Sequence, residues 1–193
     1  MKRVKFHFGK TTTSLVIVVI MLGFNALIPT SSLAQSSRAS EIDRSATQAL
    51  TTLYKSRPGA KALGDKAVAV LIFPNIVKGG FIIAGQFGDG ALRRGGKTVA
   101  YYRSLAASYG FQAGAQAFGY VLFFMDEGSV EYLDRSGGWE LGTGPSLVVL
   151  DTGFGKALST TTLQKGVYAL IFNQKGLMGG IGIQGTKITK INP

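Results

Sequence analysis

The sequence has no cysteine and a single histidine, His7. The chain can therefore form no disulfide, and it lacks the cysteine at which a lipid-anchored lipoprotein is cleaved. A cysteine–histidine nucleophile is excluded for the same reason. If His7 is removed with the N-terminal segment, a serine–histidine–aspartate triad and a zinc site of the usual histidine and cysteine kind are excluded too. Carboxylates, lysine and tyrosine are then the groups left for catalysis.

The N-terminal 34 residues have the pattern of a secretory signal peptide. Four bases between Lys2 and Lys10 precede an apolar stretch, Leu15–Ile28, and small residues at Ser32 and Ala34 predict cleavage after Ala34. The alternative is an uncleaved membrane anchor. The apolar stretch has 14 residues, including a polar asparagine, whereas a spanning helix needs about 20. We therefore expect a cleaved, exported protein that is periplasmic or extracellular and able to attach peripherally to a membrane.

Acidic residues are scarce, with 10 against 21 lysines and arginines. Cleavage after Ala34 removes four bases and leaves 159 residues with 17 bases, a net charge of +7. This length suits a single domain. Five lysines and no acid occur between residues 156 and 190. The charge predicts a basic surface that meets an anionic partner.

The pattern of apolar residues predicts a mostly-β α+β domain over residues 40–193. After a flexible lead at 35–39, Ser40 is expected to cap a helix that reaches Lys55, and Ala60–Lys66 to form another turn or two. Short apolar runs separated by glycine, proline or asparagine then predict a compact barrel-like or sandwich-like antiparallel sheet. The expected strands are Val68–Phe73, Phe81–Ala84, Thr98–Tyr102, Tyr109–Gly119, Tyr120–Met125, Leu147–Leu150, Val167–Phe172, Ile181–Ile183 and Ile188–Ile191.

Catalytic motifs give little. Glu127, Glu131 and Asp134 are spaced for one face of a short helix, and such acids could in principle supply the two catalytic carboxylates of a glycosidase. Sequence spacing does not set the distance between carboxylates that catalysis needs, so a solvent-exposed polar connecting segment is the favoured interpretation. Gly180-Ile-Gly182-Ile-Gln-Gly185 matches a dinucleotide-binding pattern but does not open a helix. Nucleic-acid binding is disfavoured because most aromatic residues lie in apolar runs. The sequence predicts no enzymatic activity and no catalytic, cofactor or metal site.

The predicted helix from Ser40 to Lys55 is amphipathic and is flanked by bases. Two interpretations are open: the helix lies on an anionic membrane, or its apolar face packs on the sheet. Packing is favoured, because Glu41 and Asp43 give it a mixed polar face. A basic outer face that touches lipid headgroups is compatible with packing.

Ordered sequence blocks from about Ser40 to the C-terminus resemble the SYLF-domain family, which has bacterial exported members and eukaryotic actin-associated, phosphoinositide-binding members. The blocks are Ala69–Pro74, Val77–Ile82, Gly85–Gly90, Tyr109–Gln116, Leu141–Pro145, Val167–Phe172 and Lys175–Gly185. The resemblance implies a β-rich domain with helices at its N-terminal side. It also implies binding to acidic phospholipids or phosphoinositide-like headgroups and no enzymatic activity. Actin bundling belongs to the eukaryotic members and is not expected of an exported chain.

We therefore expect an exported, non-catalytic module that binds an anionic phospholipid or membrane surface. The bases expected to contact phosphate groups are Arg44, Lys55, Arg57, Lys61, Lys66 and Lys78. The alternative is a structural or interaction protein of the cell envelope whose basic faces bind an acidic polymer or a partner protein.

Overall fold

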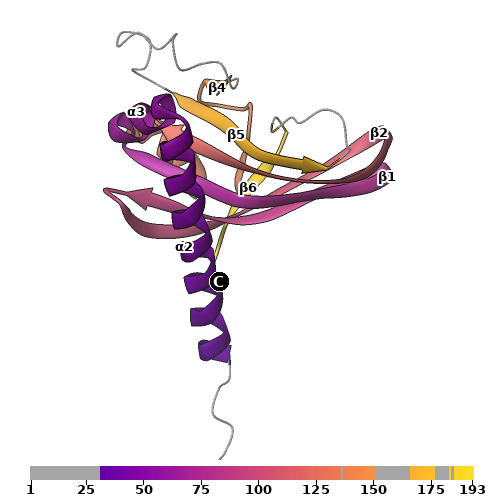
Figure 1. The fold of residues 1–193 in the computed structure, drawn as a ribbon, viewed down its shortest axis with the longest axis horizontal. Helices are drawn as coiled ribbons and strands as arrows, with labels where there is room; N and C mark the ends of the chain where they lie inside the picture. The colour runs from indigo at the N-terminus through magenta and orange to yellow at the C-terminus, as the bar shows by residue number, and fades with distance from the viewer. Residues whose placement is uncertain (1–30, 136, 151–165, 177–182, 184) are drawn as a thin grey trace, which may run out of the picture. The chain divides into compact units, whose positions relative to one another are not determined.

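The computed structural model describes residues 31–135, 137–150, 166–176, 183 and 185–193. The chain divides into two compact units, residues 1–34 and 35–193. Apart from residues 31–34, the predicted signal peptide lies outside the described residues, as does most of the predicted strand Ile181–Ile183. The elements of the second unit are a helical pair, a long β-hairpin and four shorter strands (Figure 1).

Two helices precede the sheet. Helix α2 spans Ser31–Ser56 and α3 spans Pro58–Lys66. The prediction that residues 35–39 form a flexible lead and that Ser40 caps the helix is wrong, because these residues lie inside α2. The Ser40 hydroxyl instead donates to the carbonyl oxygen of Ser37 one turn back. The end near Lys55 is confirmed: Arg57 is extended and Pro58 opens α3, where its missing N–H costs nothing. No helix within the described ranges is both long and apolar enough to cross a bilayer.

Strands β1 (Ala69–Arg94) and β2 (Lys97–Phe124) form one continuous antiparallel hairpin. Its two-residue turn, Gly95-Gly96, has positive φ at both positions, as a tight hairpin turn requires. The sequence predicts several short strands here. Register shifts at Phe73/Ile76 and Phe81/Ile83 show that Pro74-Asn75 and Gly79-Gly80 mark irregularities within one strand rather than chain reversals.

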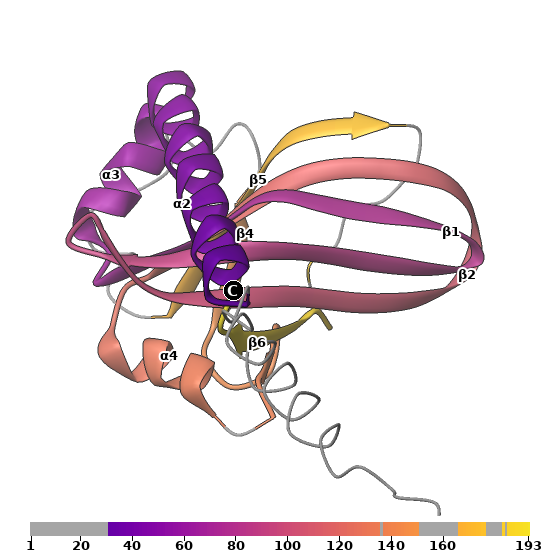
Figure 2. The ribbon, with the colours of Figure 1, turned by 90° about the horizontal axis from the view of Figure 1, so that it is seen from below.

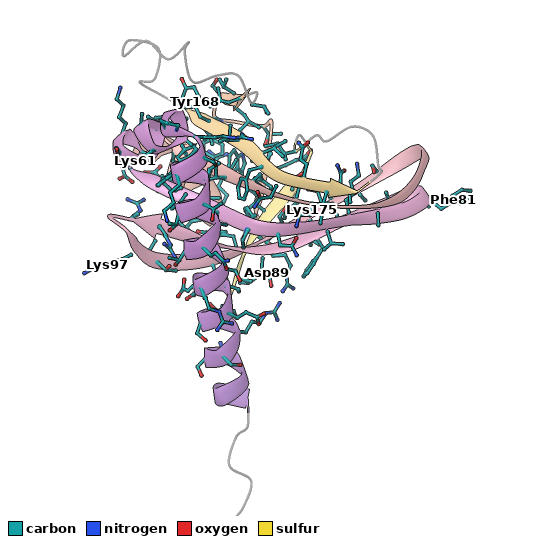
Figure 3. All side chains as sticks on the ribbon, viewed as in Figure 1. Lys61, Phe81, Asp89, Lys97, Tyr168 and Lys175 are labelled. Carbon is teal, nitrogen blue, oxygen red and sulfur yellow. The ribbon has the colours of Figure 1, made fainter. Side chains whose placement is uncertain are left out.

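The β1–β2 hairpin bends back on itself near its middle. Phe81, in the middle of β1, and Lys97, beside the turn, lie at opposite ends of the domain (Figure 3). The outgoing and returning arms of β1 pack closely at Gly88 and Gly90. A Cβ atom at Gly90 would lie 2.4 Å from the carbonyl oxygen of Ile72. We call the bend, formed by Val77–Phe87 and the facing residues from Leu105 on β2, the ribbon tip.

The rest of the sheet consists of β3 (Trp139–Glu140), β4 (Leu147–Leu150), β5 (Val167–Gly176) and β6 (Lys187–Ile191). The order is β3-β6-β2-β5-β4, and among the described strands β1 pairs with β2 alone. Between β2 and β3 lie α4 (Glu127–Glu131) and a 3-10 turn, Tyr132–Asp134. The prediction of a mostly-β α+β fold with helices at its N-terminal side is confirmed. The prediction that the sheet is antiparallel needs one correction, because β4 and β5 run parallel.

Two hydrophobic clusters lie on opposite faces of the sheet, because alternate residues of a strand point to opposite faces. One cluster is enclosed by the curled sheet and includes Phe73, Tyr120 and Trp139. The other lies between the sheet and the helices, where Leu53 and Leu63 pack with Phe123. Figure 2 shows α2 crossing the outer face of the β1–β2 ribbon.

Candidate functional site

The six predicted lipid-binding residues do not form one group. Lys55, Arg57, Lys61 and Lys66 lie at the corner between α2 and α3, which we call the helical corner. Arg44 lies three turns before Lys55 on α2. Lys78 lies on β1 at the ribbon tip, the end of the domain opposite Lys61 (Figure 3).

Two of the six have internal partners. Arg57 donates from Nη1 to the carbonyl oxygen of Ile171 on β5, at 3.3 Å, and so holds the helical corner to the sheet. Lys61 forms an ion pair with Asp65 one turn later on α3, at 2.7 Å. Arg44, Lys55 and Lys66 are exposed and form no ion pair with another described residue. These three bases remain available to a partner.

The apolar face of α2 packs on the sheet. Ile42, Ala46, Ala49 and Leu53 are buried there together with residues of β1, β2 and β5. Polar contacts continue this packing, since Asp43 accepts hydrogen bonds from Thr98 and Tyr101 of β2. The packing interpretation is therefore confirmed, and this apolar face is not free to enter a bilayer.

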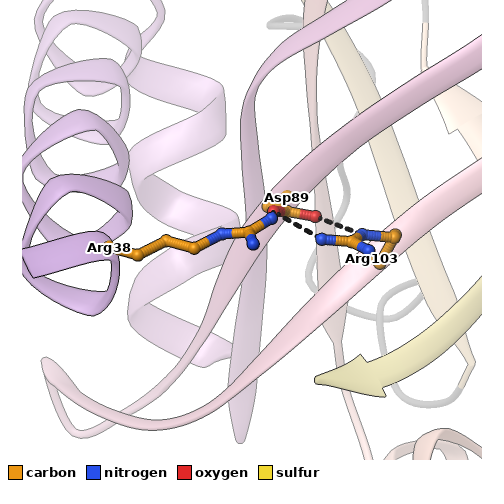
Figure 4. A network of polar contacts seen from close by, with 3 residues as sticks. All are labelled: Arg38, Asp89 and Arg103. Carbon is orange, nitrogen blue, oxygen red and sulfur yellow. Dashed lines mark hydrogen bonds and ion pairs between the residues drawn. The ribbon is translucent and has the colours of Figure 1, made fainter. Parts of the chain in front are cut away.

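Ion pairs neutralise several of the acids. Asp89 on β1 accepts hydrogen bonds from Arg38 on α2 and from Arg103 on β2 (Figure 4). Burial by itself raises the pKa of Asp89, but the hydrogen bonds from Arg103 and Arg38 outweigh it and hold this pKa below its usual value. Glu127 pairs with Arg94 and Asp134 with Lys190.

The ribbon tip carries large apolar side chains that are exposed. Phe81 is 73% exposed and Ile83 is 66% exposed. Val77, Phe87 and Leu105 are exposed as well. The run Phe81–Ala84 lies within strand β1, as predicted for a strand. The sequence did not indicate that its side chains are exposed.

Comparison with protein families supplies the identification. A family model described as "Ysc84: Las17-binding protein actin regulator" matches residues 105–192, which include most of β2 and all of β3 to β6. Residues 105–192 belong to the SYLF-domain family. The resemblance predicted from the sequence blocks is thus confirmed. No curated protein matches the chain.

A hollow of about 320 Å³ lies at the end of the domain opposite the ribbon tip. Tyr54, Asp65, Arg93 and the Gly95-Gly96 turn line it. Burial, and then the charge of Asp65, raises the pKa of Tyr54 to about 12, so its hydroxyl stays protonated at neutral pH. Arg93 donates from Nη2 to Thr47 and to the Asp43 carbonyl oxygen. Sequence reasoning did not select Arg93.

Asp126 and Asp134, two of the acids between residues 126 and 140, have structural partners. Asp126 caps α4, accepting hydrogen bonds from the backbone and hydroxyl of Ser129 and from the N–H of Gly166. Asp134 accepts from Tyr102 and from Lys190, and the hydrogen bond from Lys190 lowers the pKa of Asp134. Across the described ranges, no three acidic or histidine side chains gather as metal ligands would.

Proposed function

We propose that this protein is exported and binds membranes peripherally by recognising anionic phospholipid surfaces, without catalysing a reaction. The observation that carries the proposal is that the domain exposes both basic residues and large apolar residues. Asp65, Asp89, Glu127 and Asp134 are held in ion pairs inside the domain, while Arg44, Lys55, Lys66, Lys97 and Lys175 are exposed. An anionic surface would attract such a domain.

The exposed apolar side chains favour an amphiphile over a purely ionic partner. An acidic envelope polymer would pair with the lysines but would leave Phe81 and Ile83 in water. A phospholipid bilayer offers phosphate groups to the bases and hydrocarbon to the apolar side chains. The membership of residues 105–192 in the SYLF family supports a binding role of this kind.

Sedimentation with vesicles tests the proposal. The purified protein, with its N-terminus established by intact mass, is mixed with vesicles of phosphatidylcholine alone or with phosphatidylglycerol. We expect binding to the anionic vesicles only, weakened about tenfold or more between about 0.05 M and 0.5 M salt because salt screens exposed charges. For the exported protein we expect an intact mass that corresponds to a chain beginning at Gln35.

Equal failure to sediment with both kinds of vesicle at low salt would reject lipid binding. Retention on a purified acidic envelope polymer together with that failure would favour the envelope interaction protein instead. Turnover of a glycoside substrate that disappears in Glu127→Gln would contradict the non-catalytic part of the proposal.

A further inference from the structure

The outer face of the ribbon tip is a continuous apolar stripe. Ile83 and Phe87 lie four residues apart on β1 and so point to the same side, and the exposed Phe81 precedes them across the register shift at the bend. Leu105 lies directly opposite Phe87 on β2 and therefore shares this side. The exposed fractions of Phe81, Ile83, Phe87 and Leu105 are 73%, 66%, 46% and 43% in that order. Four large apolar side chains on one face, open to water, mark a surface that meets an apolar partner.

Helix α2 contacts this face of the ribbon at Asp89. Arg38 donates to Asp89, which lies two residues after Phe87 on β1. Arg103, which also holds Asp89, lies over the ring of Phe87 at 4.9 Å. The stripe therefore lies next to this contact, and it runs outward to the bend at Phe81.

Charge at the ribbon tip is of one sign. Lys78 precedes Phe81 by three residues, and the exposed Lys175 of β5 lies in one row with Ala117 of β2 and Val77 of β1. No acidic residue occurs between Val77 and Gly88 or between Leu105 and Met125. Lysines beside a ring of apolar side chains complement a layer of phosphate groups over hydrocarbon.

The backbone of the ribbon tip is paired along one edge of each strand. Gly79, Gly80 and Phe81 of β1 face Ala115, Gly114 and Ala113 of β2 in the antiparallel ladder. The N–H and C=O groups on the outer edges of this two-stranded segment pair with no other described strand. Such a backbone suits the interfacial layer, where headgroups and water satisfy these groups, and not the hydrocarbon core.

We propose that the ribbon tip is the part of the protein that enters the bilayer. Phe81 and Ile83 reach the boundary of the acyl chains, and Lys78 and Lys175 pair with phosphate groups of anionic lipids. This inference rests on the proposed function, which requires membrane binding but not a particular orientation. It turns the ribbon tip toward the membrane and the helical corner away from it.

Two tryptophan reporters test the orientation. Phe81→Trp places one at the ribbon tip, and Val99→Trp places the other at the opposite end of the same ribbon, at a site 54% exposed. The native Trp139 is buried and gives a constant background, measured on the unsubstituted protein. On anionic vesicles with brominated acyl chains, we expect at least a twofold loss of emission from position 81. Position 99 should show no loss.

Each outcome separates the two proposals. Sedimentation with the vesicles without quenching at position 81, or with quenching at position 99 alone, overturns the orientation and leaves lipid binding intact. Failure of all three proteins to sediment rejects lipid binding and the inference with it.

A second pair of variants measures the contribution of the apolar side chains. Phe81→Ser with Ile83→Ser is expected to weaken vesicle affinity at least tenfold, because the hydrocarbon contact is lost. Val148→Ser with Val149→Ser on β4, at sites 40% and 45% exposed, is the matched control and should leave affinity unchanged. Equal affinities of the two double variants would overturn the inference. Circular dichroism confirms that both are folded.

Discussion

Asp89 joins two arginines that come from different elements, Arg38 of α2 and Arg103 of β2. Its side chain is 12% exposed, so an uncharged replacement would leave two guanidinium groups close together without a counter-charge. We expect Asp89→Asn to lower the free energy of unfolding by about 2 kcal/mol, measured by urea denaturation. Asp65→Asn is the control. The side chains of Asp65 and Lys61 in this ion pair are 60% and 58% exposed, so the free energy of unfolding should fall by less than about 0.5 kcal/mol.

The native protein and Asp89→Asn should differ in how their stability responds to acid. The folded-state pKa of Asp89 is depressed, so its stabilisation is present above the ordinary carboxyl pKa of about 4 and is lost as pH falls through the lower folded-state value. The difference in unfolding free energy between the native protein and Asp89→Asn should therefore be constant above about pH 5 and should shrink below about pH 4. A difference that persists unchanged in acid would contradict this assignment.

Residue patterns predicted burial well where a strand is covered and poorly where it is not. Leu53 lies on the apolar face of the predicted helix, Phe73 and Val167 lie in predicted apolar strands, and all three are buried. Phe81 begins the predicted strand Phe81–Ala84, yet its side chain is exposed. An apolar strand segment does not reveal whether another layer covers it, because cover depends on where α2 ends its contact with the ribbon.

At the scale of the element, the β1–β2 ribbon depends on glycines where the outgoing and returning arms of β1 pack against each other. A Cβ atom at Gly90 would meet the Ile72 carbonyl oxygen and, at 2.7 Å, the Phe73 ring. We expect Gly90→Ala to lower the free energy of unfolding by about 3 kcal/mol, since the clash with backbone cannot relax by a rotamer change. Gly85→Ala in the same strand, with nothing within 4 Å, should be neutral or slightly stabilising in the same denaturation experiment.

Element types followed from the sequence more closely than element lengths. Periodicity predicted a helix ending near Lys55 and strands at Leu147–Leu150 and Val167–Phe172, and the structure has them. It did not predict that β1 continues through Pro74 and the Gly79-Gly80 pair. Proline and glycine can either terminate a strand or bend it. Here the long-range pairing with β2 determines that β1 continues.

At the scale of the whole molecule, the bases divide between two ends, and the division gives a test. Lys55→Gln with Lys66→Gln removes charge from the helical corner, and Lys78→Gln with Lys175→Gln removes the same charge from the ribbon tip. Each base near an anionic surface contributes about 1 kcal/mol, so the ribbon-tip pair should lower vesicle affinity about 30-fold. The helical-corner pair should lower it less, as measured by sedimentation at low salt. The reverse order would place the helical corner against lipid.

The net charge was predictable from composition, but its placement was not. Arg57 and Lys61 were selected as lipid contacts because they flank a helix. The structure instead gives them Ile171 and Asp65 as partners. Lys175 lay outside the selection because it is far from the helices in sequence. Only the pairing of β5 with β2 brings Lys175 into one row with Val77 of the ribbon tip.

The position of β6 has a consequence for the order of events during synthesis. This strand, Lys187–Ile191, lies inside the sheet between β2 and β3, and Ile188 is fully buried. Its place stays empty until the ribosome has released nearly all of the preceding polypeptide. The sheet therefore cannot be completed before residues 187–191 have left the ribosome, and until then Trp139 of β3 lacks Ile188, its neighbour in the ladder.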